Sequence, residues 1–514
     1  MYTRNIFQVF LLTVNFVFYG YTQAVQVKDI VPQNLIVPPE AVTETSVTLL
    51  WDKPPQYANV NEYDIFMNGA YLSSSAITNY TASNLHPNKK YTFTIKAKTS
   101  AGQTSLPCNK LKVETKSKGK VFNVLDFGAQ GDGSTLNTLA IQKAINACTN
   151  GGTVYIPEGK FLSGALFLKS NMTFYIAKGG ILKGSTVTKE YLPMILNRFE
   201  GWELQSFASL LNAGKLDRNG SYNVKNLTIS GAGTISGGGS VLGDAMSAEK
   251  GIRSRGRLIL LMNAQNINIQ GLTIEEPPCW TIHYVYSDNV TLHDLNISSK
   301  AKNGDGIDPD SSTDSFIFNC SFSTNDDCIA IKSGKNPEGY YVGKPTENVY
   351  ITNCNFIEGH GISIGSEMSG GVRNVIVRDC KAGNLRHGMQ IKGTKERGGF
   401  VEKVIVKDCD LLKITIFSNV GYNNDGEPAP VQPYYKDFEF SNINMTKANT
   451  KDAVIIAEGF SNNYTKNVVF KNIILPKNSE IKLSRCNNFV FENVLDVNKN
   501  KPNYKIETST NIRN

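Results

Sequence analysis

Residues 348–356 read NVYITNCNF, and the same phrase returns at 374–382 as NVIVRDCKA. Each copy has a polar first residue, a strand-like alternation, an Asn or Asp, and then a small or aliphatic residue. Alternation with a period of two predicts a β-strand with one buried face. Seven more segments share the phrase: NINIQGLTI (266–274), NVTLHDLNI (289–297), DSFIFNCSF (314–322), KVIVKDCDL (403–411), DFEFSNINM (437–445), NVVFKNIIL (467–475) and NFVFENVLD (488–496).

The small or aliphatic position of the phrase sets the period of the repeat. It recurs at intervals of 21 to 34 residues, as Leu272, Leu295, Cys320, Cys354, Cys380, Cys409, Ile443, Ile473 and Val494. Short strands repeating at this distance predict a parallel β-helix, whose coils stack about 4.8 Å apart. Cysteines at a position that Leu and Ile fill elsewhere are expected as core thiols. The absence of any CxxC spacing argues against structural zinc.

A helix is predicted ahead of the repeat. The segment NTLAIQKAINAC (137–148) has apolar residues at helical spacing, with Asn137 as a candidate N-cap. We expect this helix to cover the first coil and hide the edge of its sheet.

Stacked coils turn equivalent positions into columns. The strands WTIHYV, DGIDPD, DCIAIK, HGISIG and HGMQIK share a register in which the third residue is Ile or Met and should face inward. The first residue of each strand then lies at a bend, and these residues form a column: Trp280, Asp305, Asp327, His360 and His387. An aromatic ring, carboxylates and imidazoles in line suggest a groove for an extended sugar chain.

Three carboxylates near this bend are candidates for acid–base catalysis: Asp305, Asp326 and Asp327. Neighbouring carboxylates cannot all ionise freely, so the pKa of at least one should be raised. One protonated acid with carboxylates that activate water opposite it is the arrangement that hydrolyses a glycosidic bond.

Other polar residues near the bend have a structural interpretation. Asp308, Asp310 and Asp314 are expected to cap turns through their side chains. His387 fits a packing role as well as it fits substrate binding.

A different pattern occupies residues 32–115. It contains strand-like alternation, an Asn68-Gly69 hairpin signal and, at 85–91, the spacing of a tyrosine corner. This segment resembles a fibronectin type III domain. The segment KSKGK (116–120) is the expected linker.

Residues 1–24 have the features of a secretory signal peptide. Arg4 provides the positive start, residues 6–19 are mostly apolar, and small residues stand at 22–24. The apolar run is too short for a transmembrane helix, so we expect export to the periplasm or the medium. The formal charge of +8 suits an acidic polymer, but no dense Lys/Arg run accompanies it. We therefore expect no nucleic-acid or membrane partner, and a monomer.

Residues 121–514 resemble glycoside hydrolase family 28, the polygalacturonase family. The resemblance implies an all-β fold, a right-handed parallel β-helix preceded by the small fibronectin type III-like β-sandwich. It also implies an inverting hydrolase of α-1,4-galacturonosyl links in pectin, polygalacturonate or oligogalacturonides, without metal or cofactor. The segments that carry it are VLDFGAQGDGSTLNTLAIQKAI (124–145), RFEGWEL (198–204), PPCWTIH (277–283), GIDPDSS (306–312), NDDCIAIKSG (325–334) and GHGISIGSEMSGG (359–371).

The resemblance also implies roles for single residues. Asp326 would be the general acid, and Asp305 and Asp327 would hold and activate the water. His360 would support the acid and the substrate by hydrogen bonding. The residues expected to bind substrate are Asn303, Trp280, His387, Gln390, Lys392 and Tyr422.

One motif departs from the family. The Arg of its Arg-Ile-Lys motif is Gln390 here, while Lys392 is kept. A Gln side chain hydrogen-bonds a carboxylate but cannot form a charged fork with it. The substrate carboxylate would be held more weakly at this point, unless Arg386 or Arg397 compensates.

Exo action is expected rather than endo action. The fibronectin-like segment and IGSEMSGG (364–371) resemble the bacterial exo-acting branch, and residues 187–222 and 236–256 are long enough to wall off the groove. Alternatives are an exo-α-galacturonidase on rhamnogalacturonan or xylogalacturonan, a pectate lyase, and a non-catalytic pectin-binding β-helix. A lyase would need calcium-binding acids and a base, and a binding protein would not need three carboxylates.

Overall fold

The computed structural model describes residues 28–418 and 425–514. The chain divides into two compact units with the boundary after Lys118, inside the expected linker. Each unit has its own hydrophobic core. The predicted signal peptide and Tyr422 lie outside the described residues. Among the helices of the described residues, none is both long and apolar enough to cross a membrane.

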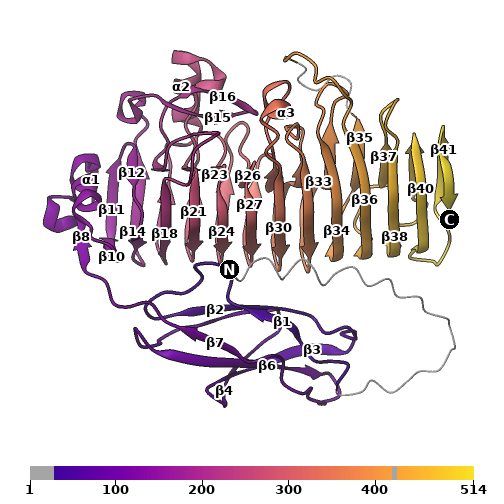
Figure 1. Cartoon of the computed structure of the whole chain (residues 1–514), viewed down its shortest axis with the longest axis horizontal. Coiled ribbons are helices and arrows are strands. Elements are labelled where there is room, and N and C mark those ends of the chain that lie inside the picture. The colour runs from indigo at the N-terminus through magenta and orange to yellow at the C-terminus, as the bar shows by residue number, and fades with distance from the viewer. Residues whose placement is uncertain (1–27, 419–424) are drawn as a thin grey trace. The chain divides into compact units, whose positions relative to one another are not determined.

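The first unit is a small antiparallel β-sandwich (Figure 1). Trp51 lies in its core, with its ring edge-on to Tyr63 at 5.5 Å between centroids. One sheet has three strands and the other four, in the orders β1 (Gln33–Ile36), β2 (Val47–Asp52), β5 (Asn79–Ala82) and β4 (Ala70–Ser75), β3 (Val60–Met67), β6 (Lys90–Thr99), β7 (Leu111–Glu114).

Two local predictions for this unit are confirmed. Asn68 and Gly69 form the two-residue turn between β3 and β4, and both have positive φ, as a type I′ turn requires. The Tyr91 hydroxyl accepts a hydrogen bond of 2.9 Å from the backbone N–H of His86, which is the bond of a tyrosine corner.

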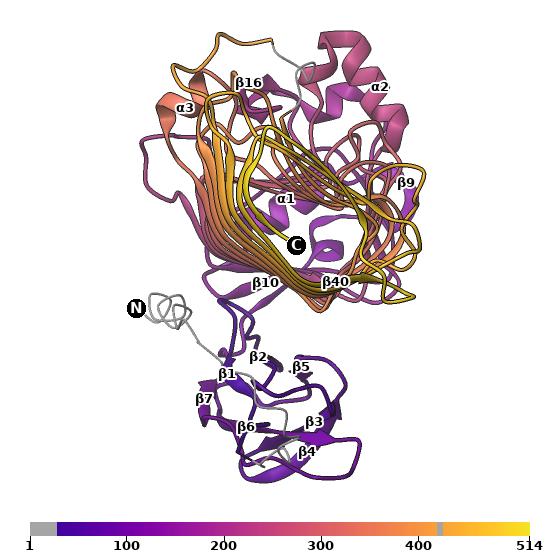
Figure 2. The same cartoon turned by 90° about the vertical axis from the view of Figure 1, so that its right-hand side faces the viewer.

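The second unit is a parallel β-helix, and Figure 2 looks along its stack of coils. One strand from each coil joins a continuous sheet of parallel strands. In chain order these strands are β8 (Val121–Asn123), β10 (Gly152–Ile156), β13 (Met172–Ile176), β18 (Val224–Gly231), β21 (Ala264–Gln270), β24 (Asp288–His293), β27 (Thr313–Phe318), β30 (Thr346–Thr352), β32 (Val372–Arg378), β34 (Phe400–Asp410), β36 (Tyr434–Asn444), β38 (Thr465–Leu475), β40 (Cys486–Asp496) and β42 (Thr510–Arg513).

Two more ladders of parallel strands complete the coils. The first contains β9 (Asp132–Leu136), β11 (Gly159–Ser163), β14 (Gly180–Gly184), β19 (Thr234–Ser236), β22 (Thr273–Glu275), β25 (Asn296–Ser299) and β28 (Ser321–Thr324). The second contains β12 (Leu166–Leu168), β17 (Leu211–Ala213), β20 (Ile259–Met262), β23 (Ile282–Val285), β26 (Ile307–Asp310), β29 (Ile329–Ile331), β35 (Ile414–Ser418), β37 (Ile455–Glu458), β39 (Glu480–Ser484) and β41 (Asn503–Glu507). The long strands β31 (Asn355–Ile364) and β33 (Lys381–Gly393) pair with both neighbouring coils and run through both ladders.

Helix α1 (Thr138–Ala147) covers the first coil, as predicted (Figure 1). Its Ile141, Ala144 and Ile145 are buried in the core. Asn137 precedes the helix but does not cap it through its side chain. The Asn137 amide instead donates to the carbonyls of Gln130 and Thr135.

The long departures from the coil period form an added layer at one edge of the stack (Figures 1 and 2). The first is an antiparallel hairpin and the second contains a helix, and a short helix lies nearby. These elements are β15 (Ile195–Phe199), β16 (Trp202–Ser206), α2 (Gly239–Lys250) and α3 (Glu338–Val342), with 3-10 turns η3 (Thr188–Tyr191) and η4 (Ile252–Ser254). A further 3-10 turn, η2 (Val124–Phe127), belongs to the first coil.

The predicted register of the inner strands is confirmed. Cα pairing runs without a shift through one buried column of the second ladder: Ile282, Ile307, Ile329, Ile362 and Met389. Each of these side chains is at most 1% exposed. The repeat phrase therefore predicts which residues of neighbouring coils touch.

The cysteines belong to the core. All nine are buried, and none is in a disulfide. Cys320, Cys354, Cys380 and Cys409 stack in successive coils, and each donates to the carbonyl two residues before it. Burial raises the pKa of Cys354, Cys380 and Cys409 well above the ordinary value of a thiol, so these groups are inert packing residues.

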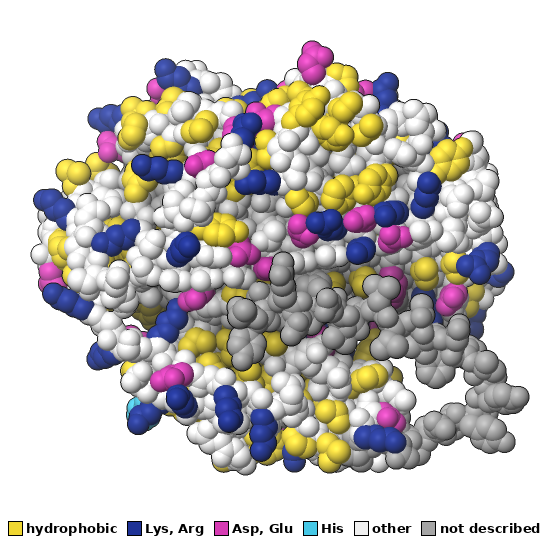
Figure 3. All heavy atoms as spheres, in the orientation of Figure 1, with side chains coloured by type: hydrophobic (Ala, Val, Ile, Leu, Met, Phe, Trp, Pro, Cys, Tyr) yellow, Lys and Arg dark blue, Asp and Glu magenta, His cyan; other side chains and the backbone are white. Residues whose placement is uncertain are grey.

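Charged groups on the outer surface have both signs. Figure 3 shows Lys, Arg, Asp and Glu side chains interspersed over one face. On the continuous sheet Arg373 pairs with Glu347, and Lys436 pairs with Glu402. The net positive charge is therefore not gathered into one patch on this face.

Asparagine side chains link the coils at their turns. Asn348 donates to Asp314 at 2.8 Å and accepts from Asn374 at 3.0 Å. All three residues have positive φ, a conformation that Asn and Asp adopt more readily than other residues with a side chain. Asp314 lies within β27 and does not cap a turn as predicted; its carboxylate accepts from the Asn348 side chain of the following coil.

Two replacements of Asn348 should separate the contribution of its side-chain hydrogen bonds from that of its left-handed backbone conformation. We expect Asn348→Ala to lower the free energy of unfolding by about 1–3 kcal/mol, because it loses the hydrogen bonds and forces Ala into a left-handed conformation. Asn348→Gly removes only the hydrogen bonds and should cost less. Chemical denaturation of both variants measures the difference in free energy of unfolding. Equal losses in the two variants would contradict the contribution of the left-handed backbone conformation.

Candidate active site

The column of bend residues lies where coils enter the second ladder. Thr281 N–H donates to the Asp305 carbonyl at 2.9 Å, and Gly306 N–H donates to the Asp327 carbonyl at 3.0 Å. In the following coils the rings of His360 and His387 are 5.3 Å apart. Trp280, Asp305, Asp327, His360 and His387 therefore succeed one another from coil to coil, as the alignment predicts.

A polar pocket opens at this column. It has a volume of about 430 Å³, including the part open to solvent. Its walls carry five carboxylates and two lysines, so charge dominates its chemistry. The lining residues are Glu200, Trp280, Asn303, Asp305, Asp326, Asp327, Lys332, Gly365, Glu367 and Lys392. We call this the carboxylate pocket.

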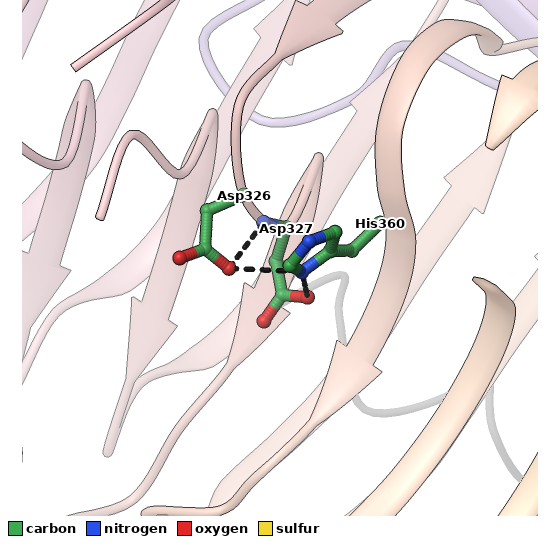
Figure 4. Close-up of side chains that lie close together, drawn as sticks. All are labelled: Asp326, Asp327 and His360. Carbon is green, nitrogen blue, oxygen red and sulfur yellow. Dashed lines mark hydrogen bonds and ion pairs between the residues drawn. The ribbon is translucent and has the colours of Figure 1, made fainter. Parts of the chain in front are cut away.

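Asp326, Asp327 and His360 form a hydrogen-bonded cluster at the pocket (Figure 4). His360 Nδ1 lies 3.1 Å from Asp326 Oδ1 and 3.6 Å from Asp327 Oδ1. The two carboxylates, Asp326 first, raise the pKa of His360 to about 9. His360 is therefore an imidazolium at neutral pH. Asp326 remains partly exposed, with 29% of its side chain accessible, and its second oxygen points away from His360 in Figure 4.

Both oxygens of Asp327 are held by neighbouring coils. Ser363 Oγ donates to Oδ1 at 2.7 Å, and Lys392 Nζ lies 3.2 Å from Oδ2. Burial acts to raise the pKa of Asp327, but Lys392, His360 and Lys332 together hold it below its ordinary value. Asp327 is therefore a fixed, ionised carboxylate.

Asp305 lies on the other side of a buried lysine. Lys332 Nζ is 3.2 Å from Asp305 Oδ2, 3.4 Å from Asp308 Oδ1 and 3.9 Å from Glu367 Oε2. Burial and then the charge of Asp308 raise the pKa of Asp305 well above its ordinary value. The expectation that at least one carboxyl pKa is raised is confirmed here.

Sequence reasoning missed Lys332 and Asp308 at this site. Asp308 does not cap a turn, because it lies within β26 and is fully buried beside Lys332. The turn cap predicted at Asp310 is also wrong. Asp310 lies in the same strand, pairs with Arg198 Nη1 at 2.8 Å and stands 3.4 Å from His283 Nε2. The period-two pattern of DGIDPD places both carboxylates on one face, but their cationic partners come from distant segments.

Trp280 does not offer an open stacking face, and this prediction is wrong. Its side chain is only 3% exposed. Lys332 Nζ and the Arg257 guanidinium lie over its ring, at 4.5 and 5.0 Å from the centroid, and Phe199 meets it edge-on at 4.7 Å. The ring supports the lysine from below the pocket instead.

The remaining candidate residues are spread around the pocket. Asn303 Oδ1 accepts a 2.8 Å bond from Arg255. Gln390 Oε1 lies 3.4 Å from Ser363 Oγ. Ser363 in turn donates to Asp327, on the coil before it. Burial, His360 and Lys392 lower the pKa of His387 to about 4, so its imidazole is neutral.

The two arginines considered as substitutes at position 390 differ in accessibility. Arg397 is fully buried and donates to Asn336 Oδ1 and the Ser366 carbonyl, so it cannot reach a substrate. Arg386 is exposed.

One end of the pocket is bounded by an ion-pair network from the added layer. Glu200, at the turn between β15 and β16, pairs with Arg253 of η4 at 2.8 Å. Arg253 also pairs with Asp425, and Asp425 pairs with Lys335. Four segments distant in sequence thus meet at the wall. We call these four residues the wall network.

The described residues offer one group of three potential metal ligands: Asp326, Asp327 and His360, whose ligand atoms lie within 4.8 Å of one another. A metal ligand must be a neutral imidazole, whereas this histidine is protonated at neutral pH. Lys392 also occupies one side of Asp327. The cluster is therefore suited to proton transfer and hydrogen bonding.

Comparison with known protein families assigns each of the two units to a family. Residues 156–500 match the pattern of glycosyl hydrolases family 28, and residues 31–111 match the fibronectin type III domain. Residues 121–185 match the group described as rhamnogalacturonase A/epimerase, pectate lyase-like.

Relatives extend over both units. The chain is 28% identical to an exo-poly-alpha-D-galacturonosidase of Dickeya chrysanthemi, over 90% of this chain and 91% of the relative. It resembles the structure of the Yersinia enterocolitica family 28 exopolygalacturonase, with a TM-score of 0.86, 26% identity and coverage of 94% of this chain and 99% of that one. An exopolygalacturonase from Thermotoga maritima has a TM-score of 0.62 and 30% identity, covering 71% of this chain and 88% of that one.

The charge state of His360 can be tested directly. We expect NMR titration of its ring to give a pKa near 9, and Asp326→Asn to bring this value down toward the ordinary value of about 6.5, because the neutral amide removes the strongest contribution. His387 serves as an internal control, since it should remain neutral down to about pH 4. An unchanged His360 titration in the variant would contradict the contact.

Proposed function

This chain belongs to glycosyl hydrolase family 28, and from that premise we propose that it is an inverting, exo-acting hydrolase of α-1,4-galacturonosyl linkages in polygalacturonate or oligogalacturonides. The observation that carries the proposal is the carboxylate pocket, which is lined by a partly exposed Asp326, a fixed Asp327 and the buried Asp305. Family membership supports the hydrolase class, and the geometry supports the division of roles.

Asp326 is proposed as the general acid. Of the three candidate aspartates it is the accessible one, with 29% of its side chain exposed against about 4% for each of the other two. It would give its proton to the glycosidic oxygen as the bond to the leaving sugar breaks. His360 and the Asp327 N–H hold Oδ1 of Asp326, which fixes the direction of the carboxyl group.

Asp305 and Asp327 are proposed to orient and deprotonate the attacking water. An inverting glycosidase uses one carboxylate as a base on the face opposite the acid, whereas a retaining enzyme uses it as a nucleophile. Both oxygens of Asp327 are already engaged by Ser363 and Lys392, and Asp305 is anchored by Lys332. Such restrained carboxylates are better suited to holding a water molecule than to attacking carbon.

Cations would recognise the acidic sugars. Lys392 lines the pocket, and the protonated His360 lies beside it. Gln390 replaces a guanidinium with a neutral amide and supplies hydrogen bonds without charge. Galacturonate would be held at this point by Lys392 and by polar contacts. Tyr422 stays a proposed substrate residue from the resemblance alone.

Exo action is supported by the wall network. Glu200 closes one side of the pocket and is tied through Arg253 and Asp425 to Lys335. A wall built at the end of a groove admits a chain terminus and excludes a continuing polymer. An enzyme that attacks such a polymer would be exported, in agreement with the leader predicted at residues 1–24.

Asp326→Asn tests the acid. We expect kcat on polygalacturonate to fall by about 10²- to 10⁴-fold, because the amide cannot supply the proton, while substrate binding measured by calorimetry persists. NMR of early products with the wild-type protein should show the inverted anomer first. Unchanged turnover in the variant would defeat the assignment, and product absorbance from a conjugated double bond would favour the lyase alternative.

Removing the wall tests the exo mode. The wild-type protein should release short products with little early loss of viscosity. Asp425→Ala should add longer oligomers and raise KM about tenfold, because Arg253 and Lys335 lose their common anion and the terminal sugar is positioned less well. Product chromatography measures both effects.

Lys471→Ala is the matched control for this test, since it removes a solvent-exposed ion pair with Glu492 and should leave the products unchanged. Rapid viscosity loss by the wild-type protein would contradict exo action, and an unchanged product pattern in Asp425→Ala would contradict the role of the wall.

A further inference from the structure

Asp308 is a buried acid for which the proposed reaction has no use. It is 0% exposed, whereas the proposed catalytic aspartates line the pocket. Its register neighbours are His283 on the preceding coil and, through the pairing of Ile307 with Ile329, Ala330 on the following one. Ala330 has a small side chain, and the Lys332 ammonium, two residues later, lies 3.4 Å from Asp308 Oδ1.

The charges in this space do not balance if every acid is ionised. Lys332 is the ammonium group that Asp305 and Asp308 share, and it also lies 3.9 Å from Glu367. Two adjacent buried carboxylates around one ammonium repel each other strongly. Neither buried oxygen of Asp308 has a hydrogen-bond partner among the described residues, and a hydrogen bond between the two carboxyl groups requires that one of them carry a proton.

We propose that Asp308 is a positioning residue that shares one proton with Asp305 across Lys332, so that the pair carries a single negative charge when an anionic sugar enters the pocket. This inference rests on the proposed function, because it assigns Asp305 to the attacking water. Asp308 does not touch the substrate. It acts by fixing the charge and the orientation of Asp305.

The surroundings of Asp308 agree with a shared proton. Burial raises the pKa of Asp308 to about 7 although Lys332 acts against this. The other charged or titratable groups that act on it come from three elements: Asp327 before β29, Arg257 before β20 and Tyr284 in β23. His283, its neighbour in the strand ladder, is neutral because burial lowers its pKa to about 4. Asp308 therefore keeps its proton through the weakly acidic range.

Loss of this proton should weaken the binding of an anionic sugar. Above about pH 7 Asp308 would lose its proton, which adds a negative charge to the pair beside the bound galacturonate. Asp308→Asn keeps a neutral hydrogen-bond donor at every pH and has nearly the same shape. The variant should therefore resemble the singly protonated state permanently.

We test this with pH profiles of kcat and kcat/KM for the wild-type protein and Asp308→Asn. Near pH 5 the variant should keep kcat within about threefold of wild type, because the oriented Asp305 is preserved. Above about pH 7 the wild type should lose kcat/KM more steeply than the variant does. Asp308→Ala lacks a donor and should lower kcat at least tenfold near pH 5, with rescue in Asp308→Asn. Identical pH profiles for wild type and Asp308→Asn, or equal losses in the Ala and Asn variants, would overturn the proposal.

A second measurement does not depend on activity. In the unfolded chain Asp308 ionises near pH 4, whereas in the folded protein it holds its proton to about pH 7. The folded state therefore binds more protons between these values, and stability falls as the pH rises through them. The difference in Tm between Asp308→Asn and wild type should grow in favour of the variant from pH 4 to about pH 7.

Asp437→Asn is the matched control for the removal of one carboxylate. Asp437 belongs to the outer ladder, where Asn occupies equivalent positions, and its variant should keep the wild-type profiles. A Tm difference for Asp308→Asn that stays constant with pH would overturn the shared proton. If Asp326→Asn retained full turnover while this Tm difference grew, the proposed catalytic roles would fail and the proton sharing would stand.

Discussion

The register between coils is the constraint on which the rest of the structure depends. Each coil hydrogen-bonds to the next through ladders of parallel strands, and the inner column from Ile282 to Met389 continues without a shift. A slip by one residue would exchange the buried and exposed faces of a strand. It would also move Asp305 and Asp327 out of line. The turns maintain the register because Asn and Asp take left-handed conformations and bind the coils above and below.

The pocket is stable because its charges are distributed over several coils. A carboxylate buried without a partner would be protonated or would destabilise the fold. Lys332, Lys392 and His360 come from successive coils and neutralise the acids near them. The same contacts create three different carboxyl groups from one residue type. Asp327 is held ionised, Asp305 has a raised pKa, and Asp326 remains accessible.

The added layer converts an open β-helix surface into a bounded pocket. A plain coil stack presents a long groove, which suits a polymer that passes through. Here the β15–β16 hairpin, η4 and the segment at Asp425 meet through the wall network. The hairpin also sends Phe199 against Trp280, which in turn supports Lys332. The insertions therefore set both the limit of the pocket and the position of a buried cation within it.

The sequence by itself determined the coils, the inner column, the cysteine stack, the helix over the first coil and the order of the bend residues, because these depend on local alternation and on a repeat that can be counted. It also identified the fibronectin-like unit from the hairpin and tyrosine-corner signals. Only the tertiary structure decided which charges meet. From the sequence, Lys332 is an ordinary strand residue, Asp308 and Asp310 are predicted turn caps, and Trp280 is a predicted stacking surface for a sugar. Their actual roles arise from contacts with Arg198, Arg257 and other segments whose positions no periodicity encodes, since charge pairing acts through space rather than along the chain.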